Sequence, residues 1–146
     1  METTADTTAI HKSITVERPI EEAFALFTDG IADWWPLEKY SIHEERAATV
    51  ALEGRVGGRL YEVSDEGEEG LWGRVTAWEP PNRLAYTWHP GRGEETTQEV
   101  EIRFIPDADG TRLELEHRGW ERAPEARAGY DKGWDAVLER YAAAGS

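Results

Sequence analysis

The segment Gly129-Tyr130-Asp131-Lys132-Gly133-Trp134 decides how this chain is interpreted. It interrupts a run of good helix formers that extends from Pro124 to Ala144. Pro124 suits the first turn of a helix, where its missing N–H does no harm. The apolar residues of this run recur every three or four positions and therefore share one helical face. They are Ala126, Tyr130, Trp134, Val137, Leu138 and Tyr141.

Two glycines lie one turn apart in the middle of this predicted helix. Each of Gly129 and Gly133 costs about 1 kcal/mol relative to alanine in a helix interior. A helix that keeps both next to its two largest aromatic residues needs bare backbone there. The sequence leaves two explanations open, a sheet that approaches the helix closely or space kept free for a ligand.

Length and composition indicate one globular domain. The chain has 146 residues, of which 39% are apolar and 10% aromatic, with seven tryptophans. We expect a domain over residues 10–146, preceded by a Thr-rich disordered tail over residues 1–9. The absence of cysteine excludes disulfides and thiol chemistry. No apolar run approaches the roughly 20 residues of a membrane span, and no signal-peptide pattern opens the chain, which favours a cytoplasmic protein.

The charge of the chain argues against two classes of partner. Thirty acidic residues against 16 basic ones give a formal net charge of −14. Such a surface repels nucleic acids and anionic membranes, so we expect neither as a partner.

The first part of the chain predicts a strand followed by short helices. Apolar and polar residues alternate over His11–Glu17, as in an edge strand. Pro19 opens a helix that Asp29-Gly30 ends, and one further turn is expected over Ile31–Trp35.

Period-two alternation then predicts six strands separated by turn residues such as Gly57-Gly58 and Pro90–Gly93. These strands are Ile42–Leu52, Arg59–Val63, Leu71–Trp78, Arg83–His89, Gln98–Ile105 and Thr111–His117. Short turns make successive strands antiparallel neighbours, so we predict a curved meander of six or seven strands. Its apolar face needs a cover, and only the C-terminal helix is long enough. The fold class is therefore α+β, with a pocket expected between sheet and helix.

The ordered set of local motifs resembles a known family. The matching pieces are Pro19-Ile20-Glu21-Glu22-Ala23-Phe24, Trp34-Trp35-Pro36, Gly57-Gly58-Arg59, Gly73-Arg74-Val75, Pro80-Pro81-Asn82-Arg83-Leu84-Ala85-Tyr86-Thr87-Trp88, His117-Arg118-Gly119-Trp120 and the glycine-interrupted helix. Together they cover about residues 10 to 142 and resemble the helix-grip fold of the START/Bet v 1-like (SRPBCC) superfamily. Within it, the chain is similar to the proteins that resemble the C-terminal domain of the activator of Hsp90 ATPase.

This resemblance implies a fold but leaves several functions open. The superfamily includes lipid carriers, cyclases and hormone receptors, and a fold alone does not determine function. The Hsp90 activators carry an additional N-terminal domain that this sequence does not contain, so a chaperone-associated role in the stress response is the less favoured expectation.

The sequence offers few candidates for chemistry. The histidines His11, His43, His89 and His117 lack metal-ligand spacing, so we expect no metal and no cofactor. His117 shares strand parity with Leu113 and Leu115 and is expected inside the pocket, while His89 is expected near its mouth. Either histidine could act as an acid or base, or be a buried structural group.

Aromatic side chains supply the candidate ligand-binding residues, together with His117. They are Trp34, Trp35, Tyr61, Tyr86, Trp88, Phe104, Tyr130 and Trp134. Our first hypothesis is a non-catalytic protein, a monomer or weak dimer, that binds a small hydrophobic or aromatic molecule. The alternative is a cyclase or dehydratase that uses His117 or His89. The simpler reading of the aromatic residues is that they only fill the core.

Overall fold

The computed structural model describes residues 7–90 and 94–145. Its first elements are β1 (Ile10–Val16) and α1 (Ile20–Phe27), followed by a 3-10 turn, η1 (Ile31–Asp33), and a second one, η2 (Glu44–Arg46). The remaining strands are β2 (Ala47–Leu52), β3 (Arg59–Ser64), β4 (Glu69–Glu79), β5 (Arg83–Trp88), β6 (Gln98–Asp107) and β7 (Gly110–Arg118). Three further 3-10 turns, η3 (Glu94–Thr96), η4 (Trp120–Arg122) and η5 (Pro124–Ala126), and the long helix α2 (Arg127–Ala144) complete the chain.

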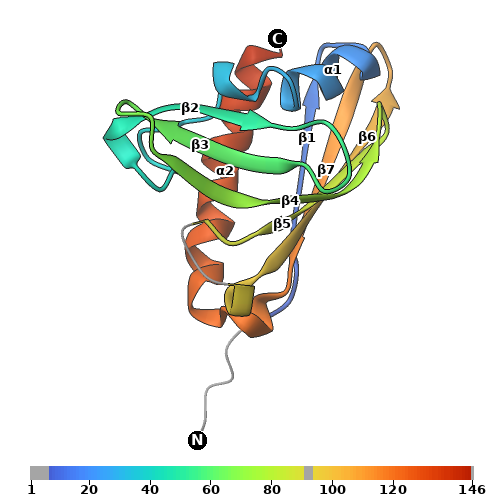
Figure 1. Ribbon diagram of the computed structural model, residues 1–146. Coiled ribbons are helices and arrows are strands. Elements are labelled where there is room, and N and C mark those ends of the chain that lie inside the picture. Colours follow the sequence, from blue (N-terminus) through green and yellow to red (C-terminus); the bar gives the residue numbers. More distant parts are fainter. Residues whose placement is uncertain (1–6, 91–93, 146) are drawn as a thin grey trace, which may run out of the picture.

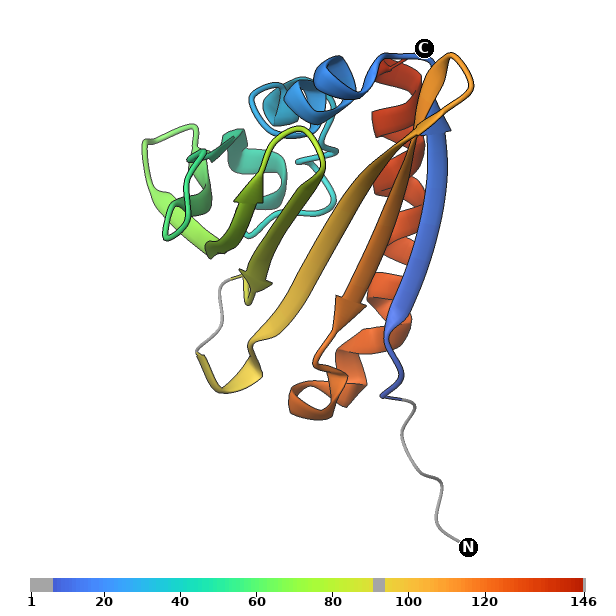
Figure 2. The same cartoon turned by 90° about the vertical axis from the view of Figure 1, so that its right-hand side faces the viewer.

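The strands form one antiparallel sheet in the order β1-β7-β6-β5-β4-β3-β2. The sheet curls around α2, which runs along its concave side (Figure 1). Figure 2 shows β1 beside α2 at one edge, where the Lys12 ammonium lies 2.8 Å from Asp131 and 3.0 Å from Asp135. The predicted α+β helix-grip architecture with seven strands is therefore confirmed.

The predicted parity of the strands is also observed. Alternate residues of β5, β6 and β7 face the concave side and are buried, while the intervening ones face out. The buried ones are Leu84, Tyr86, Trp88, Val100, Ile102, Phe104, Leu113, Leu115 and His117. The outer face carries ion pairs, of which the densest surrounds Glu101 with Arg83, Arg103 and Arg118.

Two predicted boundaries are wrong. The strand expected over Ile42–Leu52 begins only at Ala47, because the backbone N–H groups of Ile42 and His43 donate to the carboxylate of Glu62 rather than to a neighbouring strand, and the turn η2 follows. The C-terminal helix begins with a separate 3-10 turn at Pro124, and its α-helical part starts at Arg127.

Parts of two other predictions lie outside the described residues, namely residues 1–6 of the expected tail and Gly91–Gly93 of the turn after β5. Thr8, at the edge of the described part, accepts hydrogen bonds from the guanidinium of Arg127 through its carbonyl and hydroxyl oxygens. Within the described part of the chain, neither helix is long and apolar enough to cross a lipid bilayer.

Candidate functional site

The concave side of the sheet holds two aromatic clusters at opposite ends of α2. At the α1 end, Phe24, Phe27 and Phe104 pack edge to face, and Trp34 and Tyr141 close this cluster. The indole N–H of Trp34 donates to the Leu26 carbonyl oxygen at 2.8 Å. All five side chains are buried, and none of them lines the pocket described below. This end of the interior is therefore solid core.

The second cluster surrounds Trp88 near the N-terminal half of α2. The centroid of its ring lies 5.5–6.3 Å from those of six neighbouring rings, and the nearest of these is Trp72 at 5.5 Å. The other rings around Trp88 are Trp35, Tyr86, His117, Tyr130 and Trp134. This cluster does not fill the space next to α2.

A pocket of about 380 Å³ opens beside this second cluster. That volume lies in the range of small-molecule sites, about 300–1,000 Å³. Its walls come from α2, the end of β5 and the segment after Trp35. The lining residues are Trp35, Lys39, Tyr40, Ser41, Ile42, Trp88, Pro90, Ala126, Gly129, Tyr130, Gly133, Trp134 and Val137.

The two helix glycines, Gly129 and Gly133, both line the pocket, but their surroundings differ. A Cβ placed on Gly129 would meet no atom within 4 Å, so this position borders open space. A Cβ on Gly133 would lie 3.3 Å from the Tyr40 ring. No strand backbone approaches either glycine within 4 Å of that Cβ position. Of the two explanations left open by the sequence, a closely approaching sheet holds at neither glycine: Gly129 is exposed at the border of the pocket, and Gly133 packs against the Tyr40 ring.

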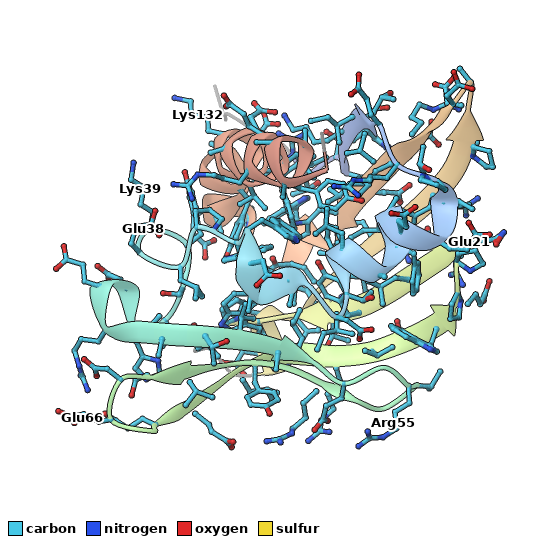
Figure 3. All side chains as sticks on the ribbon, turned by 90° about the horizontal axis from the view of Figure 1, so that it is seen from above. Glu21, Glu38, Lys39, Arg55, Glu66 and Lys132 are labelled. Atoms are coloured by element: carbon cyan, nitrogen blue, oxygen red, sulfur yellow. The ribbon has the colours of Figure 1, made fainter. Side chains whose placement is uncertain are left out.

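One wall of the pocket is an irregular segment, residues 37–43, which we call the strap. Lys39, Tyr40, Ser41 and Ile42 of the strap line the pocket. Figure 3 shows Lys39 projecting from this segment away from the interior, on the same side of the molecule as Lys132 of α2. Lys39 is the charged side chain among the lining residues, and it is exposed. The inner walls of the pocket are therefore aromatic and aliphatic.

His117 is fully buried behind the pocket, and both its ring nitrogens are engaged. Its Nδ1 accepts a hydrogen bond of 2.9 Å from the Trp134 indole, and its Nε2 lies 3.0 Å from the Gln98 amide oxygen, to which it donates. Gln98 in turn donates to the Thr96 carbonyl oxygen. Burial lowers the pKa of His117 from 6.5 to about 3. The ring is therefore neutral at pH 7, with its proton on Nε2, and it has no free nitrogen for a ligand.

Two polar atoms in the second cluster lack partners. The Tyr86 hydroxyl and the Trp88 indole N–H are buried and have no hydrogen-bond partner among the described residues. Burial raises the pKa of Tyr86 well above its usual value of 10. An unpaired buried group of this kind is unfavourable by about 1–3 kcal/mol and calls for an explanation.

The structure brings together only part of the predicted ligand-binding set. Trp35, Trp88, Tyr130 and Trp134 line the pocket. Tyr86 and His117 are buried behind these residues, and Trp34 and Phe104 belong to the solid cluster at the α1 end.

Tyr61 and His89 are placed elsewhere. Tyr61 alternates with the buried Leu60 and Glu62, so its ring lies on the outer face, 4.3 Å below the Arg59 guanidinium. His89 is half-buried, its backbone N–H donates to the Trp72 carbonyl oxygen, and it does not line the pocket. Within the described residues, no group of three His, Asp or Glu side chains is arranged to hold a metal ion.

Sequence reasoning missed the strap and the buried carboxylate beneath it. Glu62 is fully buried, and its carboxylate accepts hydrogen bonds from the backbone N–H groups of Ile42 and His43. Alternation places Glu62 on the same face of the strand as Leu60, but Tyr61 and Val63 make the opposite face the more apolar one, so the alternation of β3 does not indicate a buried carboxylate that needs donors.

These features define an α+β helix-grip domain with an aromatic pocket between its long helix and its sheet. Residues 17–144 match the family described as "Activator of Hsp90 ATPase homolog 1-like protein". The chain belongs to this family. No curated protein sequence matches it.

Solved structures with the same fold include one at appreciable sequence identity. The chain is 31% identical to an anthrahydroquino-gamma-pyrone synthase, Txn09, solved in complex with SUM; the match has a TM-score of 0.64 and covers 96% of this chain and 98% of that one. The Aha1 dimer from Colwellia psychrerythraea is 17% identical, with a TM-score of 0.73 and coverage of 94% and 96%. DynU16, from the dynemicin biosynthetic locus, is 19% identical, with a TM-score of 0.71, and the match covers 94% of this chain and 46% of that one. The last two likenesses show the fold alone.

Proposed function

We propose that the protein binds a small, flat, mostly apolar molecule in the pocket beside α2, without transforming it. The observation that carries the proposal is the pocket of about 380 Å³ beside α2, which the exposed Gly129 borders without packing against another side chain. The indoles of Trp35, Trp88 and Trp134 provide flat walls, which favour stacking with a planar ligand.

The chemistry of the lining supports binding rather than catalysis. The buried histidine nearest to the pocket has both nitrogens hydrogen-bonded, and its low pKa keeps it neutral. A general base needs a free lone pair within reach of the substrate. His117 therefore serves the structure by joining β7 to α2, and the binding hypothesis does not require it to move a proton.

A pocket-filling variant tests this proposal. In Gly129→Leu, the added Cβ meets no atom and the position is exposed, so the protein should fold, and the longer side chain should narrow the pocket that Gly129 lines. Ala128→Leu on the same helix is the matched control, because Ala128 is exposed and does not line the pocket.

The measurement is a fluorescence titration with 1-aminoanthracene, a neutral planar probe. We expect saturable binding to the wild type and to Ala128→Leu, and at least a tenfold loss of affinity in Gly129→Leu. Absence of saturable binding to the wild type, or equal binding to Gly129→Leu, would refute the proposal.

A second candidate function is ring formation on an aromatic precursor. The observation in its favour is the 31% identity, over nearly the whole chain, to a protein described as a synthase. In this chain, the acid–base groups at the pocket are the phenols of Tyr40 and Tyr130 and the ammonium of Lys39, not the predicted histidines. Incubation with a linear aromatic polyketone thioester would test it. Product formation that is lost in Gly129→Leu would favour the enzyme, and an unchanged precursor that nevertheless binds would favour the binding protein.

A further inference from the structure

The strap is fastened to the sheet through one buried carboxylate. Glu62 of β3 has no exposed surface. Its Oε1 accepts from the backbone N–H of Ile42 at 2.5 Å and from the Trp72 indole N–H at 2.5 Å. Its Oε2 accepts from the backbone N–H of His43 at 2.8 Å and lies 2.7 Å from His43 Nδ1. Four donors thus converge on two oxygens.

Four N–H groups around two oxygens require a group that only accepts hydrogen bonds, as an ionised carboxylate does. A glutamine amide has the same shape but would present an NH₂ donor to some of them. Hydrogen bonds to a charged acceptor are about twice as strong as neutral ones, which offsets the burial of the charge. Three of the four donors belong to Ile42 and His43 of the strap, and the fourth belongs to Trp72 of β4. The strap is therefore joined to both β3 and β4 at a single point.

The middle of the strap is tied to the aromatic wall. The Trp35 indole N–H donates to the Tyr40 carbonyl oxygen at 2.8 Å, and the Trp35 ring lies 5.0 Å from the Trp72 ring. At this same residue, the Tyr40 ring rests against Gly133 of α2. The Glu38 carboxylate of the strap also accepts a hydrogen bond of 3.1 Å from Arg140 of α2, at the surface. Tyr40 and Ile42 line the pocket, so the attachments that hold these two residues bear on its width.

We propose that Glu62 is a positioning residue for ligand binding, a latch that holds the strap closed as one wall of the pocket. Glu62 does not line the pocket itself and acts through Ile42 and His43. This inference rests on the proposed function, since it assigns Glu62 a role in the same pocket. The inference also states that Glu62 fixes the strap in the protein without a ligand, which can be tested separately.

Glu62→Gln is the informative substitution. The amide keeps the shape of the side chain but replaces one acceptor oxygen with an NH₂ group, which faces at least one backbone N–H donor of the strap whichever way it turns. The matched control is Glu101→Gln on the outer face of the sheet. Glu101 is also nearly buried, at 8% exposure, and it accepts from three arginines, but it has no contact with the strap.

Hydrogen exchange of backbone amides tests the latch without any ligand. Loss of charge-assisted hydrogen bonds should speed the exchange of the Ile42 and His43 amides roughly ten- to hundredfold in Glu62→Gln. Glu101→Gln should leave these two amides at the wild-type rate even if it lowers the global stability. Equal exchange in Glu62→Gln and the wild type would overturn the inference.

Affinity for 1-aminoanthracene supplies the second readout. We expect about a tenfold weaker affinity in Glu62→Gln and an unchanged affinity in Glu101→Gln. If the wild type does not bind the probe, the proposed function fails, whereas the exchange rates still decide whether the latch exists. Unchanged affinity in Glu62→Gln, with binding intact in the wild type, would show that the latch does not serve the pocket.

A milder variant keeps the inference testable if Glu62→Gln does not fold. His43→Ala removes one of the four donors and leaves the carboxylate and its backbone partners in place. Only 14% of the His43 side chain is exposed, so its ring covers part of the carboxylate. The same two amides should exchange faster than in the wild type, by less than in Glu62→Gln. Wild-type exchange and affinity in His43→Ala would count against the latch.

Discussion

The indole N–H of Trp134 donates a hydrogen bond of 2.9 Å to Nδ1 of His117, and this bond joins α2 to β7 in the interior. It requires that Nδ1 be unprotonated, so the ring carries its proton on Nε2 and donates to Gln98. Trp120 adds a ring 4.2 Å from the imidazole, and its N–H donates to the His117 carbonyl oxygen. The histidine therefore connects the helix, the sheet and the turn η4, and its protonation state matters for stability.

Acid should destabilise the protein through His117. The folded-state pKa is lowered to about 3, while the unfolded chain titrates near 6.5, so the unfolded state binds the proton first as the pH falls. The stabilisation is complete above pH 6.5 and is lost on acidification towards pH 3. Between pH 7 and pH 5 this one group should reduce the free energy of unfolding by about 2 kcal/mol.

Urea denaturation of the wild type and His117→Gln at pH 7, 6 and 5 measures the contribution of His117 to the pH dependence of the free energy of unfolding. The variant should be less stable at pH 7, but its stability should fall with acidification by about 2 kcal/mol less than that of the wild type. Parallel pH dependences of the two proteins would contradict a buried neutral histidine.

Two buried tyrosines should respond oppositely to the loss of their hydroxyl groups. The Tyr141 hydroxyl donates to the Ala23 carbonyl oxygen at 2.7 Å, whereas that of Tyr86 has no partner among the described residues. Tyr141→Phe should destabilise the fold by about 1–2 kcal/mol, and Tyr86→Phe should be neutral or stabilising by up to about 1 kcal/mol. Chemical denaturation of the two variants compares them directly. A destabilised Tyr86→Phe would mean that the hydroxyl has a partner in solution, such as an internal water molecule.

Alanine at two glycines should also give opposite results. A Cβ at Gly129 meets nothing, so Gly129→Ala should stabilise the protein by about 1 kcal/mol through helix propensity. A Cβ at Gly73 of β4 would lie 1.7 Å from the Thr87 carbonyl oxygen, so β4 and β5 would have to separate. Gly73→Ala should therefore destabilise by about 3 kcal/mol or more. Thermal unfolding followed by circular dichroism checks both, and a stable Gly73→Ala protein would contradict the close approach of these strands.

The alternation of the strands predicted most of the fold. Residues such as Leu84, Val100 and Leu113 recur every second position, and the only long helix is apolar on one face, so an antiparallel sheet covered by that helix follows from hydrophobic burial alone. Aromatic residues near Gly129 likewise indicated the pocket, and four of the nine predicted ligand-binding residues line it.

The features of the fold and the site that the sequence did not predict depend on contacts between segments far apart in the chain. On β3, hydrophobicity alone favours Tyr61 and Val63 as the inward pair, yet Leu60, Glu62 and Ser64 face inward. The reason is that the strap, about 20 residues earlier in the chain by the spacing of Ile42 and Glu62, supplies the donors that make a buried carboxylate tolerable. Sequence alternation carries no information about such a partner. Likewise, only one of the two aromatic clusters borders the pocket, which the residue types do not reveal.

The most direct test of a ligand pocket beside α2 is the response of the individual tryptophans to a planar ligand. In a ¹H–¹⁵N spectrum, each tryptophan gives one indole N–H signal, which can be assigned with single Trp→Phe variants. Titration with 1-aminoanthracene should shift the signals of Trp35, Trp88 and Trp134, which line the pocket, and leave that of Trp34 unchanged in the solid cluster at the α1 end. Saturation without any shift at Trp88 and Trp134, or with the largest shift at Trp34, would contradict this account.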